Sequence, residues 1–189
     1  MVRPLFLLIL GLWACTPNRP IKDDYSEIIS FLLKTEFEKV DLLILDTEPV
    51  SISESTPEHN KIIRPYLELY ARKGFIKHED INHILEHADS LKTTMLDSAA
   101  FTIKTMTRDR IDGLFSVHGI DSTLDYLHNQ YNVQEIGSFS TPLFSKDKSV
   151  IIFWAKTWRN PLSAHGYIFI FRKDHNKWKM IESGGTFES

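Results

Sequence analysis

The last fifth of the chain alternates long apolar runs with short polar gaps. Three runs rich in β-forming residues follow one another there, Val150–Trp158, Tyr167–Phe171 and Trp178–Ile181. Neighbouring strands joined by short gaps pair most readily, because the entropy lost on closing a loop grows with its length. We therefore predict an antiparallel β-meander at the C-terminal end of the protein.

Both faces of the predicted meander are apolar near its centre. In the first run Val150, Ile152 and Trp154 alternate with Ile151 and Phe153, so neither set is polar. A strand that is apolar on both sides is usually central in its sheet and covered twice. We expect a curved sheet with helices on one face, while loops cover the other face or leave it partly exposed.

The first two thirds of the chain carry apolar residues at helical spacing, together with capping signals. The predicted helices begin at Asp24, run between Pro65 and Gly74, cover about Glu79–Leu91, and extend from Ser122 to Asn132.

Shorter segments complete this part of the chain. Apolar or β-branched content predicts strands at Leu42–Leu45 and Phe101–Met106, whereas polar, turn-forming residues predict a loop at Ser51–Asn60 and a turn at Arg108–Gly113. Without an internal repeat or a break in composition, residues 23–189 are expected to form a single α+β domain, with N-terminal helices packed on the meander.

The N-terminus has the pattern of a secretory signal. Arg3 supplies a positive charge, and the uncharged run Leu5–Ala14 ends immediately before Cys15, the only cysteine of the chain. Ten apolar residues are too few for a membrane-spanning helix, which needs about 20. Residues 1–14 are therefore predicted to be a signal peptide.

The quartet Leu12-Trp13-Ala14-Cys15 resembles the lipobox of bacterial lipoproteins. The resemblance implies cleavage before Cys15, acylation of that cysteine, and a lipid-anchored protein of the cell envelope facing the periplasm or the exterior. Residues 15–22 would then be the lipidated cysteine and a short tether, since Thr16–Lys22 holds two prolines and no periodic pattern. The alternative is an ordinary signal peptide with an incidental cysteine.

Three further segments, two of them near the C-terminus, carry a second resemblance. The segment Phe139–Lys148 (FSTPLFSKDK), the segment Asn176–Met180 (NKWKM) and the helix start His78–Ile81 (HEDI) are similar to parts of lipoproteins of unknown function from Gram-negative bacteria. These motifs are structural, so the resemblance implies no activity.

One string has the form of a metallopeptidase motif. His83-Ile84-Leu85-Glu86-His87 satisfies the H-x-x-E-H pattern, in which two histidines one helical turn apart share Zn²⁺ and the glutamate activates water. However, the apolar stripe of this helix centres nearly opposite His83, which predicts that both imidazoles face solvent. The preferred interpretation is therefore a helix face exposed to solvent. A zinc-dependent hydrolase using His83, Glu86 and His87 is the alternative hypothesis.

The connector between the first two predicted strands offers a second candidate surface. It places Trp158, Arg159, His165 and Tyr167 at one end of a hairpin, and Trp, Tyr and Arg are the residues that most often anchor interfaces. The structural alternative is that the aromatic residues close the edge of the sheet and Arg159 is solvated.

Charge and motif content narrow the possible functions. The formal net charge is −3 and the lysines are scattered among acids, which argues against nucleic acid as a partner. The sequence has no phosphate-binding glycine loop, serine-hydrolase elbow or calcium loop, and no cofactor is predicted. The leading hypothesis is a non-enzymatic binding or accessory lipoprotein whose partner is an envelope or secreted protein; a toxin-immunity lipoprotein is a further alternative.

Overall fold

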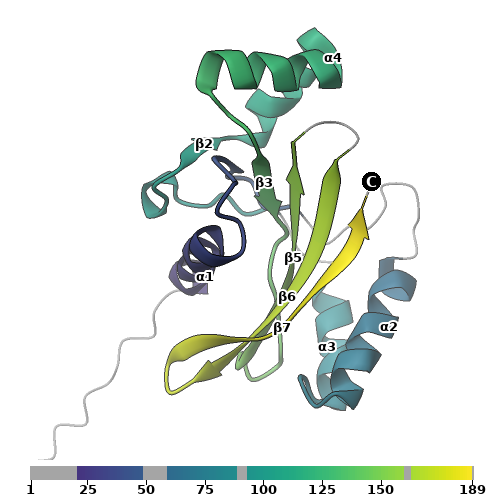
Figure 1. The fold of residues 1–189 in the computed structure, drawn as a ribbon. Coiled ribbons are helices and arrows are strands. Elements are labelled where there is room, and N and C mark those ends of the chain that lie inside the picture. Colours follow the sequence, from purple (N-terminus) through teal and green to yellow (C-terminus); the bar gives the residue numbers. More distant parts are fainter. Residues whose placement is uncertain (1–20, 49–58, 89–92, 160–162, 189) are drawn as a thin grey trace, which may run out of the picture.

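A computed structural model describes residues 21–48, 59–88, 93–159 and 163–188. Their strands form one mixed sheet in the order β2-β1-β3-β5-β6-β7, with β4 paired to β5 as well (Figure 1). The strands are β1 Leu42–Ile44, β2 Lys104–Met106, β3 Ile136–Phe139, β4 Leu143–Phe144, β5 Val150–Trp158, β6 Ala164–Asp174 and β7 Lys177–Glu188. The helices are α1 Ile21–Thr35, α2 His59–Arg72, α3 His78–Ala88, the short 3₁₀ helix η1 Ser98–Ala100, and α4 Arg108–Tyr131. This is the predicted α+β layout.

Strands β5, β6 and β7 form the predicted antiparallel meander. Phe153 lies opposite Phe169 in the β5–β6 pair, and Phe169 lies opposite Ser183 in the β6–β7 pair. The β6–β7 hairpin turns at His175 and Asn176, which both have positive φ, as a tight two-residue turn requires. Strand β7 is an edge strand with two irregularities in its register, and such bulges discourage edge-to-edge association.

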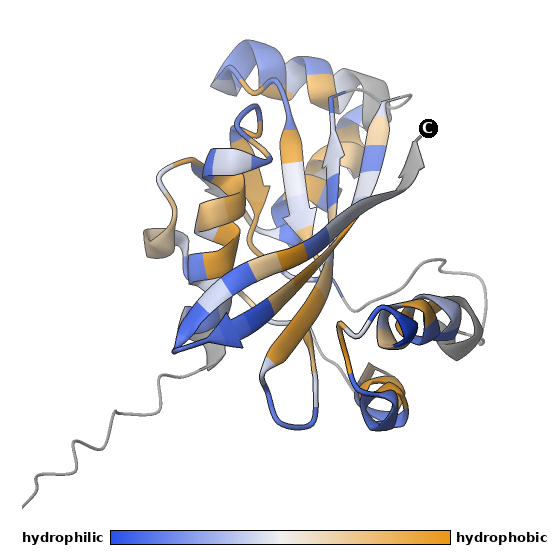
Figure 2. Ribbon diagram, turned by 60° about the horizontal axis from the view of Figure 1, so that its bottom comes forward, coloured by the Kyte–Doolittle hydropathy of each residue, from blue (hydrophilic) through white to orange (hydrophobic). Residues whose placement is uncertain are grey.

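The expectation of a single helix-covered face was wrong, because helices cover both faces of the meander. On one face Ile151, Phe153 and Phe169 pack with residues of α1, including Ile29 and Leu32. The opposite face packs under α2 and α3 through a second set of buried side chains, among them Ile63, Leu67, Ile84, Ile152 and Ile170. Figure 2 shows apolar colour on the sheet and on the facing sides of α2 and α3. Both apolar faces of these strands are therefore buried.

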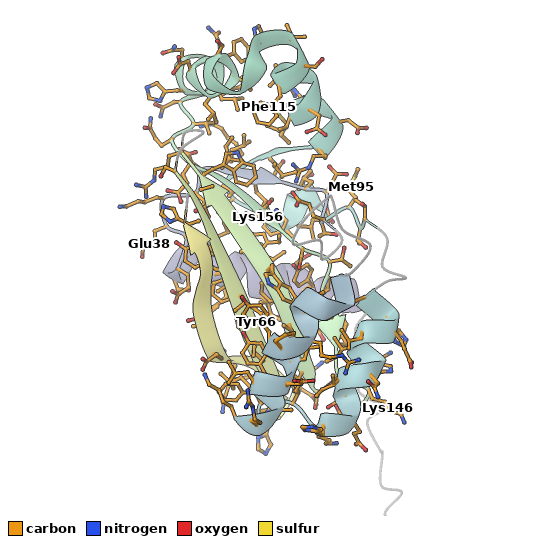
Figure 3. All side chains as sticks on the ribbon, turned by 90° about the vertical axis from the view of Figure 1, so that its right-hand side faces the viewer. Glu38, Tyr66, Met95, Phe115, Lys146 and Lys156 are labelled. Atoms are coloured by element: carbon orange, nitrogen blue, oxygen red, sulfur yellow. The ribbon has the colours of Figure 1, made fainter. Side chains whose placement is uncertain are left out.

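The rest of the sheet contains the predicted strand at Leu42–Leu45 and part of the one at Phe101–Met106, but its parallel pairing and strand β3 were not predicted. Strand β1 pairs in parallel with both β2 and β3, and β3 then pairs antiparallel with β5. Helix α4 covers this part of the sheet through Ile111 and Leu127, which pack on Leu42, Ile44 and Ile136. Because Ile136 lies opposite Trp158 and so shares the face of Trp154, α4 lies on the same side of the sheet as α2 and α3 (Figure 3).

The boundaries of α1, α2 and α4 differ from the predictions. Helix α1 begins at Ile21, three residues before Asp24. Pro65 lies inside α2 instead of starting it, although Gly74 has the positive φ of a helix end. The predicted turn at Arg108–Gly113 is the first part of α4, which bends at Gly119, where φ is 73°.

Other segment predictions hold in part. The strand expected at Phe101–Met106 is shorter, and the helix expected to reach Leu91 is described as far as Ala88. Within the predicted loop Ser51–Asn60, residues 51–58 lie outside the described part, and His59 and Asn60 already belong to α2. Among the described helices, none is both long and apolar enough to cross a membrane.

Candidate functional site

The four connector residues predicted to bind a partner lie on two different faces of the sheet. Trp158 ends β5 and lies opposite Ile136 and Ala164. Its half-buried ring packs against the apolar cluster beneath α4. Trp158 therefore contributes to the core on the α4 side of the sheet. Residues 160–162 of the connector lie outside the described part of the chain.

His165 and Tyr167 lie on the α1 side of the sheet. They are opposite Thr157 and Ala155, one position out of phase with Trp158. The Tyr167 ring lies 5.3 Å from that of Phe37 and 6.5 Å from that of His165, measured between centroids. Both side chains are half-buried, so this end of the α1 face is an aromatic surface with partial access to solvent.

Arg159 holds a buried carboxylate at this end of the sheet. Its Nε atom donates a hydrogen bond of 2.6 Å to Oε2 of Glu135. The Glu135 side chain is 8% exposed and that of Arg159 is 48% exposed. A buried charge is costly to leave unpaired, so the pair neutralises Glu135 where β3 begins. Arg159 is therefore partly solvated, as predicted, but it also pairs with Glu135.

Asp41 completes the polar arrangement next to Glu135. Its carboxylate accepts hydrogen bonds from the backbone N–H groups of Gln134, at 2.9 and 3.1 Å, and of Glu135, at 3.4 Å. These bonds fix the start of β3 against the start of β1. Sequence reasoning missed Asp41 and Glu135 because β3 itself was not predicted.

The three residues of the H-x-x-E-H string lie on α3. The His83 and His87 rings are 4.1 Å apart and tilted by 40°, and Nδ1 of His87 lies 2.7 Å from the carbonyl oxygen of His83. Glu86 and His87 are exposed, and His83 is half-buried. The described residues contain no group of three or more His, Cys, Asp or Glu side chains that could hold a metal ion.

A charged cluster that the sequence did not point to lies on the sheet between α4 and α2. Glu48 accepts hydrogen bonds on both carboxylate oxygens, from Nη2 of Arg108 and, at 3.4 Å, from Nζ of Lys156. The backbone N–H of Arg108 donates to Asp46 at 2.5 Å. Burial lowers the pKa of Arg108, and the nearby carboxylates of Asp112 and Asp46 oppose that shift. Since both Glu48 oxygens are engaged, the cluster joins the start of α4 to the sheet.

Cys15, the predicted lipidation site, lies outside the described residues. Comparison with known proteins found no matching family model, no similar curated protein and no similar solved structure.

Proposed function

We propose that the protein is a lipoprotein of the cell envelope, anchored through Cys15, that acts as a non-enzymatic binding or accessory module. The anchor is inferred from the resemblance of Leu12-Trp13-Ala14-Cys15 to a lipobox. A contact between the first turn of α1 and the base of the β6–β7 hairpin orients the sheet relative to that anchor. Lys173 Nζ donates to Asp24 Oδ2 at 2.8 Å. Helix α1 begins only six residues after Cys15. This contact therefore holds the hairpin end of the sheet close to the proposed anchor.

The connector lies at the opposite end of the sheet from the hairpin tip. Strand β6 runs from Ala164 beside the connector to Asp174 at the tip (Figure 1). Its eleven residues span about 33 Å at the usual rise of a β-strand. A protein anchored at the hairpin end would therefore present the connector away from the membrane, toward an envelope or secreted partner.

The aromatic and basic side chains of that end suit a protein partner. His165 and Tyr167 offer a partly accessible aromatic surface on the α1 face. Among the described contacts, Arg159 uses only Nε in side-chain bonding, and its guanidinium has further N–H donors that could reach a partner carboxylate. A secreted toxin, as the immunity hypothesis requires, would be one partner of this kind.

Photo-crosslinking from the connector tests the proposed contact surface. We would place a photoreactive amino acid at Ser163, inside the connector, and in a matched variant at the exposed Glu86 on α3. The proposal predicts one discrete crosslinked product in intact cells from Ser163 and none from Glu86. Equal crosslinking from the two sites, or none from Ser163, would contradict it.

A further inference from the structure

Basic side chains gather at the tip of the β6–β7 hairpin, although the chain as a whole is acidic. Residues 172–179 contain four basic side chains, Arg172, Lys173, Lys177 and Lys179, and one acid, Asp174. The formal net charge of the whole chain is −3. The tip is therefore a local reversal of the overall charge.

The turn between β4 and β5 adds to this charge. The backbone N–H of Lys173 donates to the carbonyl oxygen of Ser149 at 2.8 Å, which places residues 145–149 beside the hairpin. Lys146 and Lys148 of that turn are exposed. We refer to the following lysines as the basic end: Lys146, Lys148, Lys173, Lys177 and Lys179. Figure 2 shows hydrophilic colour on both the hairpin tip and the turn.

The acids at this end are already neutralised by neighbours. Asp174 pairs with Nζ of Lys179 and, at 2.6 Å, with Nδ1 of His175. Asp147 accepts hydrogen bonds from Ser145 and Ser149 and pairs with Lys77 at 3.1 Å.

Three lysines of the basic end, Lys146, Lys148 and Lys177, form no ion pair with any residue that the structure describes, and all three are exposed. A surface of this kind attracts anions and gains further from an anion that several lysines approach together.

The position of the basic end next to α1 points to the identity of that anion. On the proposed function, on which this inference rests, Cys15 is embedded in a bilayer, and five residues separate it from Ile21. Six Cα–Cα steps reach at most about 20 Å. Asp24 in the first turn of α1 contacts Lys173, so the basic end is held within reach of the lipid headgroups.

We propose that the basic end docks on anionic phospholipid headgroups beside the lipid anchor. Lysines close to an anionic membrane surface strengthen binding by about fivefold each, and the effect fades within a Debye length of about 8 Å. Docking at the hairpin fixes the orientation of the sheet, which a flexible lipid anchor alone does not do.

Lysine footprinting on the full acylated chain tests this proposal. The protein is reconstituted in vesicles of phosphatidylcholine alone or with one third phosphatidylglycerol, and acetylation of each lysine is followed by mass spectrometry. We expect Lys148 and Lys177 to react several-fold more slowly in the anionic vesicles. Lys104 on β2, the strand at the edge of the sheet opposite β7, is the internal control and should react equally in both.

A charge-matched pair of variants identifies the lysines responsible. Lys177→Gln with Lys179→Gln should weaken docking by about 25-fold and abolish the protection of Lys148. Lys34→Gln with Lys104→Gln changes the net charge equally and should leave that protection intact. Equal acetylation of Lys148 and Lys177 in the two vesicle types, or loss of protection in both variants, would overturn the proposal.

Flotation separates failure of the anchor from failure of the docking. An acylated chain floats with neutral vesicles regardless of its lysines, so a chain that does not float contradicts the proposed anchor. Such a chain still tests the docking surface, because binding to anionic vesicles that is lost in the Lys177→Gln, Lys179→Gln variant supports it. Anionic binding unaffected by that variant, or absent altogether, contradicts it.

Discussion

Arg159 and Glu135 form a hydrogen-bonded ion pair of 2.6 Å across the end of the sheet, with the carboxylate buried and the guanidinium half exposed. The pair joins the end of β5 to the residue that precedes β3. Arg159 thus has a structural task in addition to any contact with a partner, and experiments on the connector have to separate the two.

Arg159→Ala is expected to destabilise the protein by about 2 kcal/mol, because it leaves the charge of Glu135 buried without its partner. Chemical denaturation measures the loss. Adding Glu135→Gln should recover part of it, since a neutral amide costs less to bury than a carboxylate. A double variant no more stable than Arg159→Ala would contradict the importance of the buried charge.

Partner capture is predicted to depend on Tyr167 more directly than on Trp158. Tyr167→Phe keeps the ring against Phe37 and removes the hydroxyl, so it should reduce crosslinking from Ser163. The thermal midpoint of the variant, measured alongside, separates a loss of binding from a loss of stability. Trp158→Ala should cost about 3 kcal/mol of stability by emptying a site beneath α4. Capture that is unchanged in Tyr167→Phe would show that the hydroxyl takes no part in binding.

Stability near the β4–β5 turn should depend on pH through Asp147. Hydrogen bonds from Ser149 and Ser145, with a smaller contribution from Lys77, hold the pKa of this carboxyl well below its ordinary value. The pKa of Asp147 is lower in the folded protein than in the unfolded chain, where it is about 3.9. The ionised carboxylate therefore stabilises the fold fully above about pH 3.9, and this contribution is lost as the pH falls below that value.

The variant Asp147→Asn isolates this contribution. Asp147 is half exposed, so solvent screening limits its contribution to about 1 kcal/mol. The unfolding free energies of wild type and variant should differ by this amount at neutral pH and converge in acid. A difference that does not change with pH would contradict the assignment.

Asp80 is expected to contribute strongly to the free energy of unfolding. Its buried carboxylate accepts from the backbone N–H of Lys77, at 3.0 Å, and of Lys146, at 2.9 Å, and so ties the start of α3 to the β4–β5 turn. Asp80→Ala should cost about 2 kcal/mol by denaturation, because two N–H groups lose their acceptor. The exposed neighbour Glu79→Ala is the matched control and should change little.

Zinc content distinguishes the hydrolase hypothesis from the binding module. Protein purified without chelator or affinity tag should hold well under one zinc per chain, because the described residues bring no third ligand to His83 and His87. Elemental mass spectrometry gives the content. One zinc per chain that disappears in His83→Ala would support the hydrolase instead.

The meander could be predicted from sequence because long alternating strands with short gaps leave few other pairings. Strand β3 could not, since its residues Ile136-Gly137-Ser138-Phe139 lack the usual β-forming composition. A Cβ on Gly137 would lie 2.9 Å from Cγ1 of Val40, so the glycine is needed for close packing. Parallel pairing of β1 with β2 and β3 depends on contacts far apart in the chain, which local patterns do not carry.

The candidate site was predictable in residue content but not in arrangement. Trp158 and Tyr167 are both near the connector, yet the register of the β5–β6 hairpin puts them on opposite faces. That register is set by tertiary pairing, and a shift of one residue would exchange the faces. The apolar stripe of α3, in which Ile81, Ile84 and Leu85 face the core, correctly predicted that His87 is exposed. It also predicted that His83 faces solvent, whereas His83 is half-buried.

Membrane fractionation of cells that express the wild-type chain or Cys15→Ser tests the central proposal most directly. An anchor at Cys15 predicts that the wild type sediments with membranes and resists extraction by high salt. The Cys15→Ser variant should then move to the soluble fraction or be retained as an uncleaved precursor of higher mass. A wild-type chain that is soluble, or that partitions like Cys15→Ser with an unmodified Cys15 by mass spectrometry, would contradict the account.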